Sequence, residues 1–257
     1  MKARFSKLTL VTVALLTLTA CSQSQSTSSK SSAKEETKQT QTKSSKETSS
    51  AKDTSKETGK EESSKAGKSD VKVDSGVSYN GSYYSVKGKY GEVMIANKHY
   101  PLSPDFNPGE DPEAVSALHE LIAAMQAEGY AISDQYSGFR SYETQVDLYQ
   151  SYVNKDGAAA ADRYSARPGY SEHQTGLAFD LIDTSGNLVQ EAGASKWLLK
   201  NAAKYGFIVR YQEGKEASTG YMPESWHLRY IGEDAKDVAA SGKSLEEYFN
   251  FTGGDYE

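Results

Sequence analysis

The fold of this chain is constrained first by residues 22–76, which consist almost entirely of Ser, Thr, Lys, Glu, Gln and Gly. Such a stretch has too few apolar side chains to form a core, so we expect it to be disordered. Its eleven lysines and nine acidic residues nearly cancel, which predicts a flexible tether (residues 21–76) rather than a nucleic-acid-binding arm. The remaining residues, 77–257, suffice for one domain with a single core.

The start of the chain, residues 1–20, combines three basic residues with a short apolar run, as signal peptides do. The run is too short and too rich in threonine for a membrane-spanning helix. It ends at the only cysteine, Cys21, in a segment that resembles a bacterial lipobox, although a signal peptide with a chance cysteine is the alternative. The lipobox predicts cleavage before Cys21, lipidation of its sulfur, and a palmitoylated lipoprotein on the outer face of a Gram-positive-type cell membrane. Lipidation leaves no thiol for a disulfide.

The folded part mixes helical and strand-like patterns, which predicts an α+β fold with helices flanking a small antiparallel sheet. Caps and apolar periodicity predict helices over 112–129 (capped by Asp111), 141–153, 158–164 and 195–205, and a last helix opened by a capping box at Ser244. In the second helix, Val146, Tyr149 and Val153 are expected to face inward. Strands are predicted over 92–96, 131–137, 177–182, 207–211 and 226–231.

One stretch, residues 171–180, places His173 and Asp180 seven residues apart, with Gly176 between them where the backbone has to turn. Asp180 lies in a largely apolar strand, where a carboxylate needs either an arginine partner or a metal ion. A third candidate ligand, His227, lies on another strand. Two imidazoles and one carboxylate are a ligand set typical of catalytic zinc, with the fourth position left for water. The other two histidines, His99 and His119, have no comparable ligands near them in the sequence, and His119 is expected to be an ordinary surface or boundary residue.

A spare carboxylate, Glu224, lies three residues before His227. It is either a solvated loop residue or the general base that takes a proton from water and passes it to the leaving amine. In a fully extended strand the two side chains would point to opposite faces. If both serve one metal ion, the chain has to bend near residues 223–225.

These residues carry a resemblance to the VanY-type family of zinc D,D- and L,D-carboxypeptidases. The motifs are Ser171-x-His173-x-x-Gly176-x-Ala178-x-Asp180 and Glu224-x-Trp226-His227, with further likeness at residues 95–102 and 137–141. The resemblance covers roughly residues 90 to 250 and no ligand or base position departs from it. It implies one zinc ion on His173, Asp180 and His227, Glu224 as base, and an antiparallel sheet flanked by helices.

A carboxypeptidase has to recognise a terminal carboxylate, and a guanidinium does so with two parallel hydrogen bonds. Arg140 is the candidate, both by this chemistry and by the resemblance, with a surface salt bridge as the alternative. Ser171 and Gln145 are further candidates for hydrogen bonds to the peptide.

The resemblance implies removal of D-Ala from peptidoglycan stem peptides by a monomer that touches the membrane only through its lipid. The tethered design most resembles L,D-type streptococcal-like lipoproteins, which favours the tetrapeptide; a D,D-enzyme acting on the pentapeptide is the alternative. A metal-scavenging lipoprotein would not need Glu224 and Arg140, and a non-catalytic peptidoglycan-binding module would not need a base. With 15 basic and 26 acidic residues, residues 77–257 are a poor partner for nucleic acid.

Overall fold

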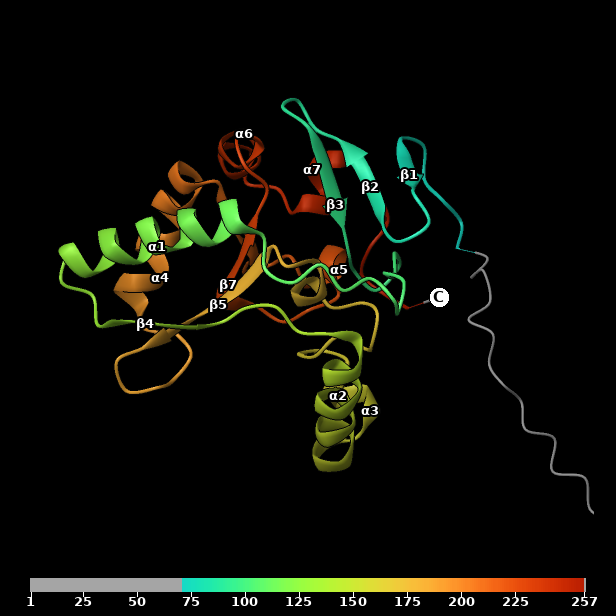
Figure 1. Ribbon diagram of the computed structural model, residues 1–257, viewed down its shortest axis with the longest axis horizontal. Coiled ribbons are helices and arrows are strands. Elements are labelled where there is room, and N and C mark those ends of the chain that lie inside the picture. The colour runs from blue at the N-terminus through green and yellow to red at the C-terminus, as the bar shows by residue number, and fades with distance from the viewer. Residues whose placement is uncertain (1–70, 257) are drawn as a thin grey trace, which may run out of the picture. The chain divides into compact units, whose positions relative to one another are not determined.

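A computed structural model describes residues 71–256 of the chain, and the fold below is that of these residues (Figure 1). The predicted signal peptide, Cys21 and most of the predicted tether lie outside the described residues. Helices surround two antiparallel sheets, so the predicted α+β class is confirmed, although we expected one sheet and not two.

The larger sheet has the order β4-β5-β7-β6, and its strands lie close to the predicted segments. All its neighbouring pairs are antiparallel. The strands are β4 (Ile132–Ser137), β5 (Ala178–Asp183), β7 (Glu224–Tyr230) and β6 (Phe207–Tyr211).

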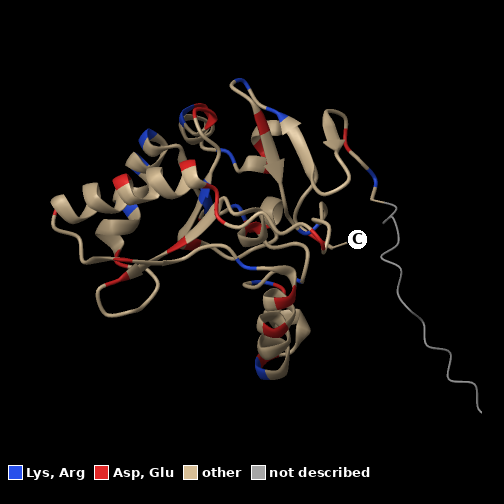
Figure 2. Cartoon of the chain, in the orientation of Figure 1, with Lys and Arg blue, Asp and Glu red and all other residues tan. Residues whose placement is uncertain are grey.

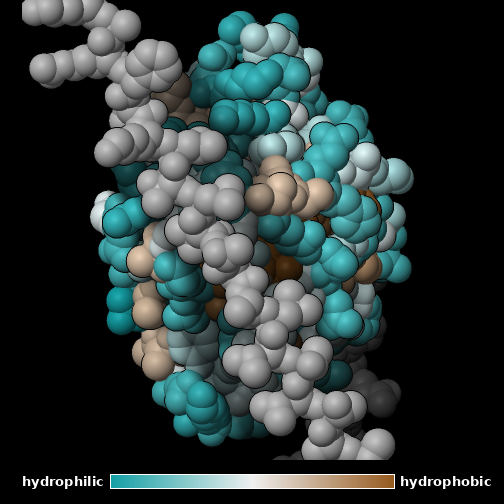
Figure 3. All heavy atoms as spheres, turned by 90° about the vertical axis from the view of Figure 1, so that its left-hand side faces the viewer, coloured by the Kyte–Doolittle hydropathy of each residue, from teal (hydrophilic) through white to brown (hydrophobic). Residues whose placement is uncertain are grey.

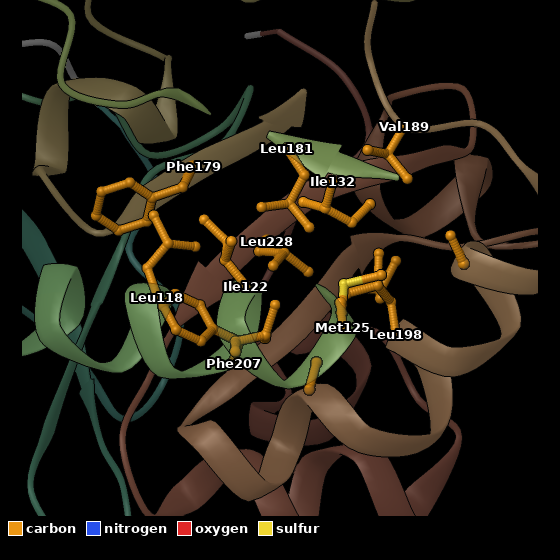
Figure 4. Packing of buried hydrophobic residues seen from close by; sticks show 14 of the residues in the cluster. Leu118, Ile122, Met125, Ile132, Phe179, Leu181, Val189, Leu198, Phe207 and Leu228 are labelled. Carbon is orange, nitrogen blue, oxygen red and sulfur yellow. The ribbon is translucent and has the colours of Figure 1, made fainter. Parts of the chain in front are cut away.

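One face of this sheet packs against α1 (Pro112–Ala127) and α4 (Ala192–Asn201). Figure 4 shows Leu118 and Ile122 of α1 pointing toward the sheet residues Phe179, Leu181 and Leu228. Burying each such side chain contributes about 1.5–3 kcal/mol. Because side chains alternate along a strand, the neighbours of these core residues on β5 and β7 point to the opposite face of the sheet.

Local capping sets the ends of these helices. Asp111 accepts a hydrogen bond from the backbone N–H of Ala114 at 2.9 Å, as predicted for the start of α1. Helix α4 begins three residues earlier than predicted because the carboxylate of Glu191 caps it. Its predicted last turn is instead the 3₁₀ helix η2 (Ala202–Tyr205).

The smaller sheet, β1-β2-β3, packs with the last two helices around a second apolar cluster. Its strands are β1 (Val77–Tyr79), β2 (Tyr84–Lys87) and β3 (Glu92–Ile95), and the helices are α6 (Asp234–Ser241), which we did not predict, and α7 (Leu245–Phe249). The predicted capping box of Ser244 and Glu247 opens α7. Ile208 of β6 joins this cluster, so the smaller sheet lies on the second face of the larger one.

Residues 71–76, which we had assigned to the tether, make ordered contacts with the domain. The carboxylate of Asp74 accepts a hydrogen bond from the Tyr100 hydroxyl at 2.7 Å, and the carbonyl of Lys72 lies 2.9 Å from Nε2 of His99. The residues that contact the domain therefore include some before position 77.

Helices α2 (Tyr142–Asp156) and α3 (Ala158–Ala161) form a hairpin that lies apart from both sheets, at the bottom of Figure 1. The prediction that Val146 faces inward is wrong, because this side chain is 40% exposed. Tyr149 and Val153 are half-buried, and Gln145 is the buried residue of α2. With so few apolar positions, apolar spacing alone did not identify the inward face.

The surface of the described part is largely polar. Figure 2 shows acidic and basic residues together on α2 and α6. On the face shown in Figure 3, the described residues are mostly hydrophilic and the hydrophobic ones form small areas. Among residues 71–256, no helix has both the length and the apolar character needed to cross a membrane.

Candidate metal centre

The second face of the larger sheet brings two of the predicted ligands together. Asp180 of β5 is directly opposite His227 of β7 and is also paired with Ser137 of β4. Directly opposed residues of an antiparallel pair point to the same face. Asp180 Oδ1 lies 3.1 Å from Nδ1 of His227.

His173 reaches the same point from the 3₁₀ helix η1 (Glu172–Thr175). Its Nε2 lies 3.3 Å from Asp180 Oδ2. The helix ends at Gly176, whose φ of 74° is left-handed, and a Cβ there would lie 2.0 Å from the carbonyl oxygen of Gly109. Only glycine fits this turn, so the predicted role of Gly176 is confirmed.

In each imidazole, the ring nitrogen that does not face Asp180 lies next to a hydrogen-bond acceptor. His173 Nδ1 lies 2.8 Å from the carbonyl oxygen of Gly138, and His227 Nε2 lies 3.2 Å from Glu172 Oε2. In the neutral imidazole, the nitrogen that faces such an acceptor carries the proton, which leaves the lone pair on Nε2 of His173 and on Nδ1 of His227. This arrangement is how metal-binding histidines are usually oriented.

The three side chains fit a metal ion. One ligand atom from each of His173, Asp180 and His227 lies within 4.8 Å of the others. All three are buried, and within residues 71–256 no hydrogen-bond partner of Asp180 Oδ1 is present although this atom is shielded from water. A buried carboxylate oxygen without such a partner is costly unless a cation binds it.

Without a metal ion, Asp180 and His227 strongly shift each other's pKa. Burial would raise the pKa of Asp180, but the neighbouring imidazoles hold it far below its usual range. Burial would lower the pKa of His227, but the carboxylates of Asp180 and Glu172 raise it to about 10.

Glu224, at the start of β7, lies at the same site. Its Oε2 is 3.7 Å from Nδ1 of His227. The pairing of β6 with β7 shifts between Val209–Leu228 and Tyr211–Glu224, so β7 uses two more residues than β6 there. This irregularity lies between Glu224 and Leu228, slightly later than the bend expected near residues 223–225, and lets Glu224 and His227 face one site. Burial raises the pKa of Glu224 to about 7, and the carboxylates of Asp180 and Glu172 add to the effect.

Sequence reasoning missed Glu172, which is fully buried behind His227. Its Oε1 accepts hydrogen bonds from Arg210 Nε at 2.8 Å and from Arg229 Nη1 at 2.9 Å. Burial would raise the pKa of Glu172, but the two guanidinium groups hold it far below its usual range. The signal was present: Arg210 and Arg229 interrupt apolar strands, and buried guanidinium groups require a carboxylate partner.

Arg140 follows β4 and is joined to His173 through the backbone, because its N–H donates to the His173 carbonyl at 3.3 Å. Its Nη1 donates to Gln145 Oε1 at 2.9 Å. The Nε2 of Gln145 donates to the carbonyl of Ala166 at 2.6 Å, so both ends of this amide bind protein groups. Gln145 thus lies behind Arg140 rather than in the cavity wall, where we had expected it to bind the peptide.

A cavity of about 200 Å³ unites the predicted site residues. Six of the seven predicted side chains line it: Arg140, Ser171, His173, Asp180, Glu224 and His227. Its remaining wall is largely aromatic and apolar, from Leu148, Tyr152, Tyr164, Leu188, Tyr211, Tyr221 and Trp226. The buried His99 and the exposed His119 lie outside it.

Comparison with known proteins agrees with this geometry. The profile of the VanY family, described as D-alanyl-D-alanine carboxypeptidase, matches residues 109–233. The L,D-carboxypeptidase DacB of Streptococcus pneumoniae is 66% identical, with a TM-score of 0.69 over 72% of this chain and 100% of that structure. The chain belongs to the VanY family of carboxypeptidases. A vancomycin-resistance D,D-pentapeptidase VanY, whose structure contains Zn(II), is 31% identical, with a TM-score of 0.53 over 60% of this chain and 96% of that one.

Curated relatives are less similar to this chain than DacB is. The putative carboxypeptidase YodJ of Bacillus subtilis is 37% identical in an alignment over 182 residues that covers 61% of this chain and 66% of YodJ. This chain therefore spans just under two thirds of YodJ, and only about half of the D-alanyl-D-alanine carboxypeptidase of Enterococcus faecalis.

Proposed function

We propose that this protein is a zinc-dependent L,D-carboxypeptidase that removes the C-terminal D-Ala from stem tetrapeptides of peptidoglycan. The observation that carries the proposal is the single cavity lined by the ligand set His173, Asp180 and His227, the carboxylate Glu224 and the guanidinium of Arg140. The 66% identity to the L,D-carboxypeptidase DacB supports the choice of bond.

The residues divide the reaction between them. Arg140 holds the carboxylate of the terminal D-Ala, and this fixes the preceding peptide bond near the two histidines. His173, Asp180 and His227 would hold a zinc ion, which when bound would polarise the scissile carbonyl as a Lewis acid and lower the pKa of the attacking water. Glu224 accepts the proton of that water and passes it to the leaving amine of D-Ala.

The environment of Glu224 suits this task. A carboxylate whose pKa is raised to about 7 by burial is a stronger base than an exposed one, and when protonated it is still acidic enough to donate. Glu224 Oε2 lies 3.7 Å from Nδ1 of His227, the nitrogen proposed to bind the metal ion, and this keeps the carboxylate beside the reacting water.

A D,D-carboxypeptidase that acts on the pentapeptide is the second candidate. It is supported by the family description and by the 31% identical D,D-pentapeptidase, which is less similar to this chain than DacB. Both reactions would use the same metal ligands, the same base and the same arginine, so only a comparison of the two substrates distinguishes them.

The deciding experiment compares a stem tetrapeptide and a stem pentapeptide, incubated separately with the purified protein and analysed by mass spectrometry. We expect the tetrapeptide to lose one alanine and the pentapeptide to be a poor substrate. Loss of alanine from the pentapeptide alone would replace the L,D-activity by the D,D-activity. Cleavage of neither would contradict the enzymatic proposal and favour a binding module.

For the position in the cell we propose a monomer anchored by lipid on Cys21 at the outer face of the membrane. The support is the lipobox-like sequence and the tether that follows it. Replacement of Cys21 by Ser should release the protein into the medium; a Cys21→Ser protein that stays with the membrane would contradict the anchor.

A further inference from the structure

A segment far from the catalytic motifs, residues 252–256, packs against the wall of the cavity. The hydroxyl of Tyr256 accepts a hydrogen bond from the backbone N–H of Arg167 at 2.9 Å. It also lies 3.4 Å from the hydroxyl of Tyr221, which lines the cavity. The guanidinium carbon of Arg167 lies 4.1 Å from the centre of the Tyr256 ring.

Close contacts surround Tyr256 and the backbone that precedes it. Lys98 is only 5% exposed, and its Nζ lies 4.9 Å from the ring centre of Tyr221 and 5.2 Å from that of Tyr256. A cation held between two desolvated aromatic rings stabilises both. At Gly220, where φ is +82°, a Cβ would lie 2.3 Å from the carbonyl oxygen of Gly254, so the two backbones touch.

From Tyr256, a short series of hydrogen bonds leads to Arg140. Arg167 is bound to the Tyr256 hydroxyl through its backbone N–H, and the carbonyl of the preceding residue, Ala166, accepts from Gln145 Nε2. The other end of the Gln145 amide accepts from Arg140 Nη1. Residues 165–167 therefore connect the Tyr256 ring to the guanidinium that faces the substrate.

We infer that Tyr256 is a positioning residue for recognition of the substrate carboxylate. It fixes residues 165–167, these fix the Gln145 amide, and the amide fixes the plane of the Arg140 guanidinium. An arginine has many rotamers, so its forked hydrogen bonds gain most when the fork is held in place beforehand. This role rests on the proposed function, because it assigns Arg140 to the carboxylate of D-Ala.

The test measures kcat and KM for release of D-Ala from the tetrapeptide in a double-mutant cycle. Tyr256→Ala removes both the ring and the hydroxyl, and Tyr256→Phe removes the hydroxyl but keeps the ring. Each variant is made in the native background and together with Arg140→Lys. Tyr79→Phe is the matched control, because the Tyr79 hydroxyl donates to the carbonyl of Gly81 in an exposed turn. Zinc content checks that every variant keeps its centre.

With Arg140 present, we expect Tyr256→Ala to lower kcat/KM about 10- to 100-fold, mainly through KM, since a small misplacement of a clamp is this costly. Tyr256→Phe should lose less, and Tyr79→Phe nothing. With Arg140→Lys in place, Tyr256→Ala should cost little more, because residues that act through one another are not additive. An equal loss in both backgrounds, or no loss in either, would overturn the inference.

A second readout does not depend on activity. The NMR resonance of the Arg140 Nε–H, assigned by its absence in Arg140→Lys, should shift in Tyr256→Ala and not in Tyr79→Phe. If the unmodified protein releases no D-Ala, the proposed function fails. This resonance then tests by itself whether Tyr256 positions the Arg140 guanidinium. An unchanged resonance would contradict it.

Discussion

Glu172 Oε2 lies 3.2 Å from Nε2 of His227, on the side of the imidazole that faces away from Asp180. The other oxygen of the same carboxylate binds Arg210 and Arg229. Arg210 continues to Glu246 of α7, and Arg229 to the carbonyl of Met94 in β3. A buried network of charges thus connects one candidate ligand to the smaller sheet and to the last helix.

Replacing Glu172 by Gln tests whether this network orients the ligand. The amide keeps the shape but loses the charge, so zinc affinity should fall about 10- to 100-fold, as is typical when the hydrogen-bond partner of a ligand is changed. Competition with a chromogenic chelator measures it.

The same substitution removes the carboxylate partner of the buried Arg229 and leaves Arg210 with Glu246 alone, which should lower the free energy of unfolding by about 3–5 kcal/mol. Urea unfolding measures this loss. Glu120→Gln, on the exposed side of α1, is the control for both measurements and should change neither. Unchanged zinc affinity in Glu172→Gln would show that the carboxylate has no part in the metal centre.

Replacing Glu224 by Gln should separate metal binding from turnover. The amide cannot take a proton from water, so kcat should fall about 10²- to 10⁴-fold, the usual contribution of a general base. Zinc content should be unchanged, since three other side chains form the ligand set. A variant that keeps its activity would remove Glu224 from the reaction, and one that loses its zinc would make it a ligand.

Replacing Arg140 by Lys should weaken recognition of the terminal carboxylate. Lysine keeps the charge but not the fork, and a hydrogen bond to a charged group is worth about 1.5–3 kcal/mol, so kcat/KM should fall roughly 10- to 150-fold. A peptide with a C-terminal amide tests the reason: the native protein should cleave it poorly, and Arg140→Lys should reduce that rate little further. An equal reduction for both peptides would show that Arg140 does not bind the carboxylate.

Zinc binding should release protons near neutral pH. In the metal-free protein the pKa of His227 is raised to about 10, so the imidazole is protonated at pH 7.5, whereas a metal ion binds only the neutral form. Calorimetry in buffers of different ionisation heat should report at least one proton released per zinc, and none from this group above pH 10. The exposed His119, replaced by Gln, should leave the number unchanged. A value of zero at pH 7.5 would contradict the coupling.

The sequence predicted most where the deciding interactions are local. The spacing of His173 and Asp180 around Gly176 lies within one short segment, and Asp111, Ser141 and Ser244 cap the helices that follow them directly. Such features depend on a few neighbouring residues, so they can be recognised without the fold.

The rest depended on contacts between distant parts of the chain. Glu172 meets Arg210 and Arg229 only because η1 lies over the larger sheet, and no local pattern pairs them. Gln145 was predicted to bind the peptide, but it is buried behind Arg140. Its position there depends on residues 165–167, which are distant in sequence, so no local pattern shows it. Val146 was placed inward on apolar character alone, although α2 has almost no core to face.

The most direct test of the account is release of D-Ala from the stem tetrapeptide before and after removal of metal. We predict that the native protein releases one D-Ala per peptide, that a chelator abolishes the release, and that zinc restores it. Release that continues in the presence of the chelator, with the protein shown to be free of metal, would contradict the proposed metal centre of His173, Asp180 and His227.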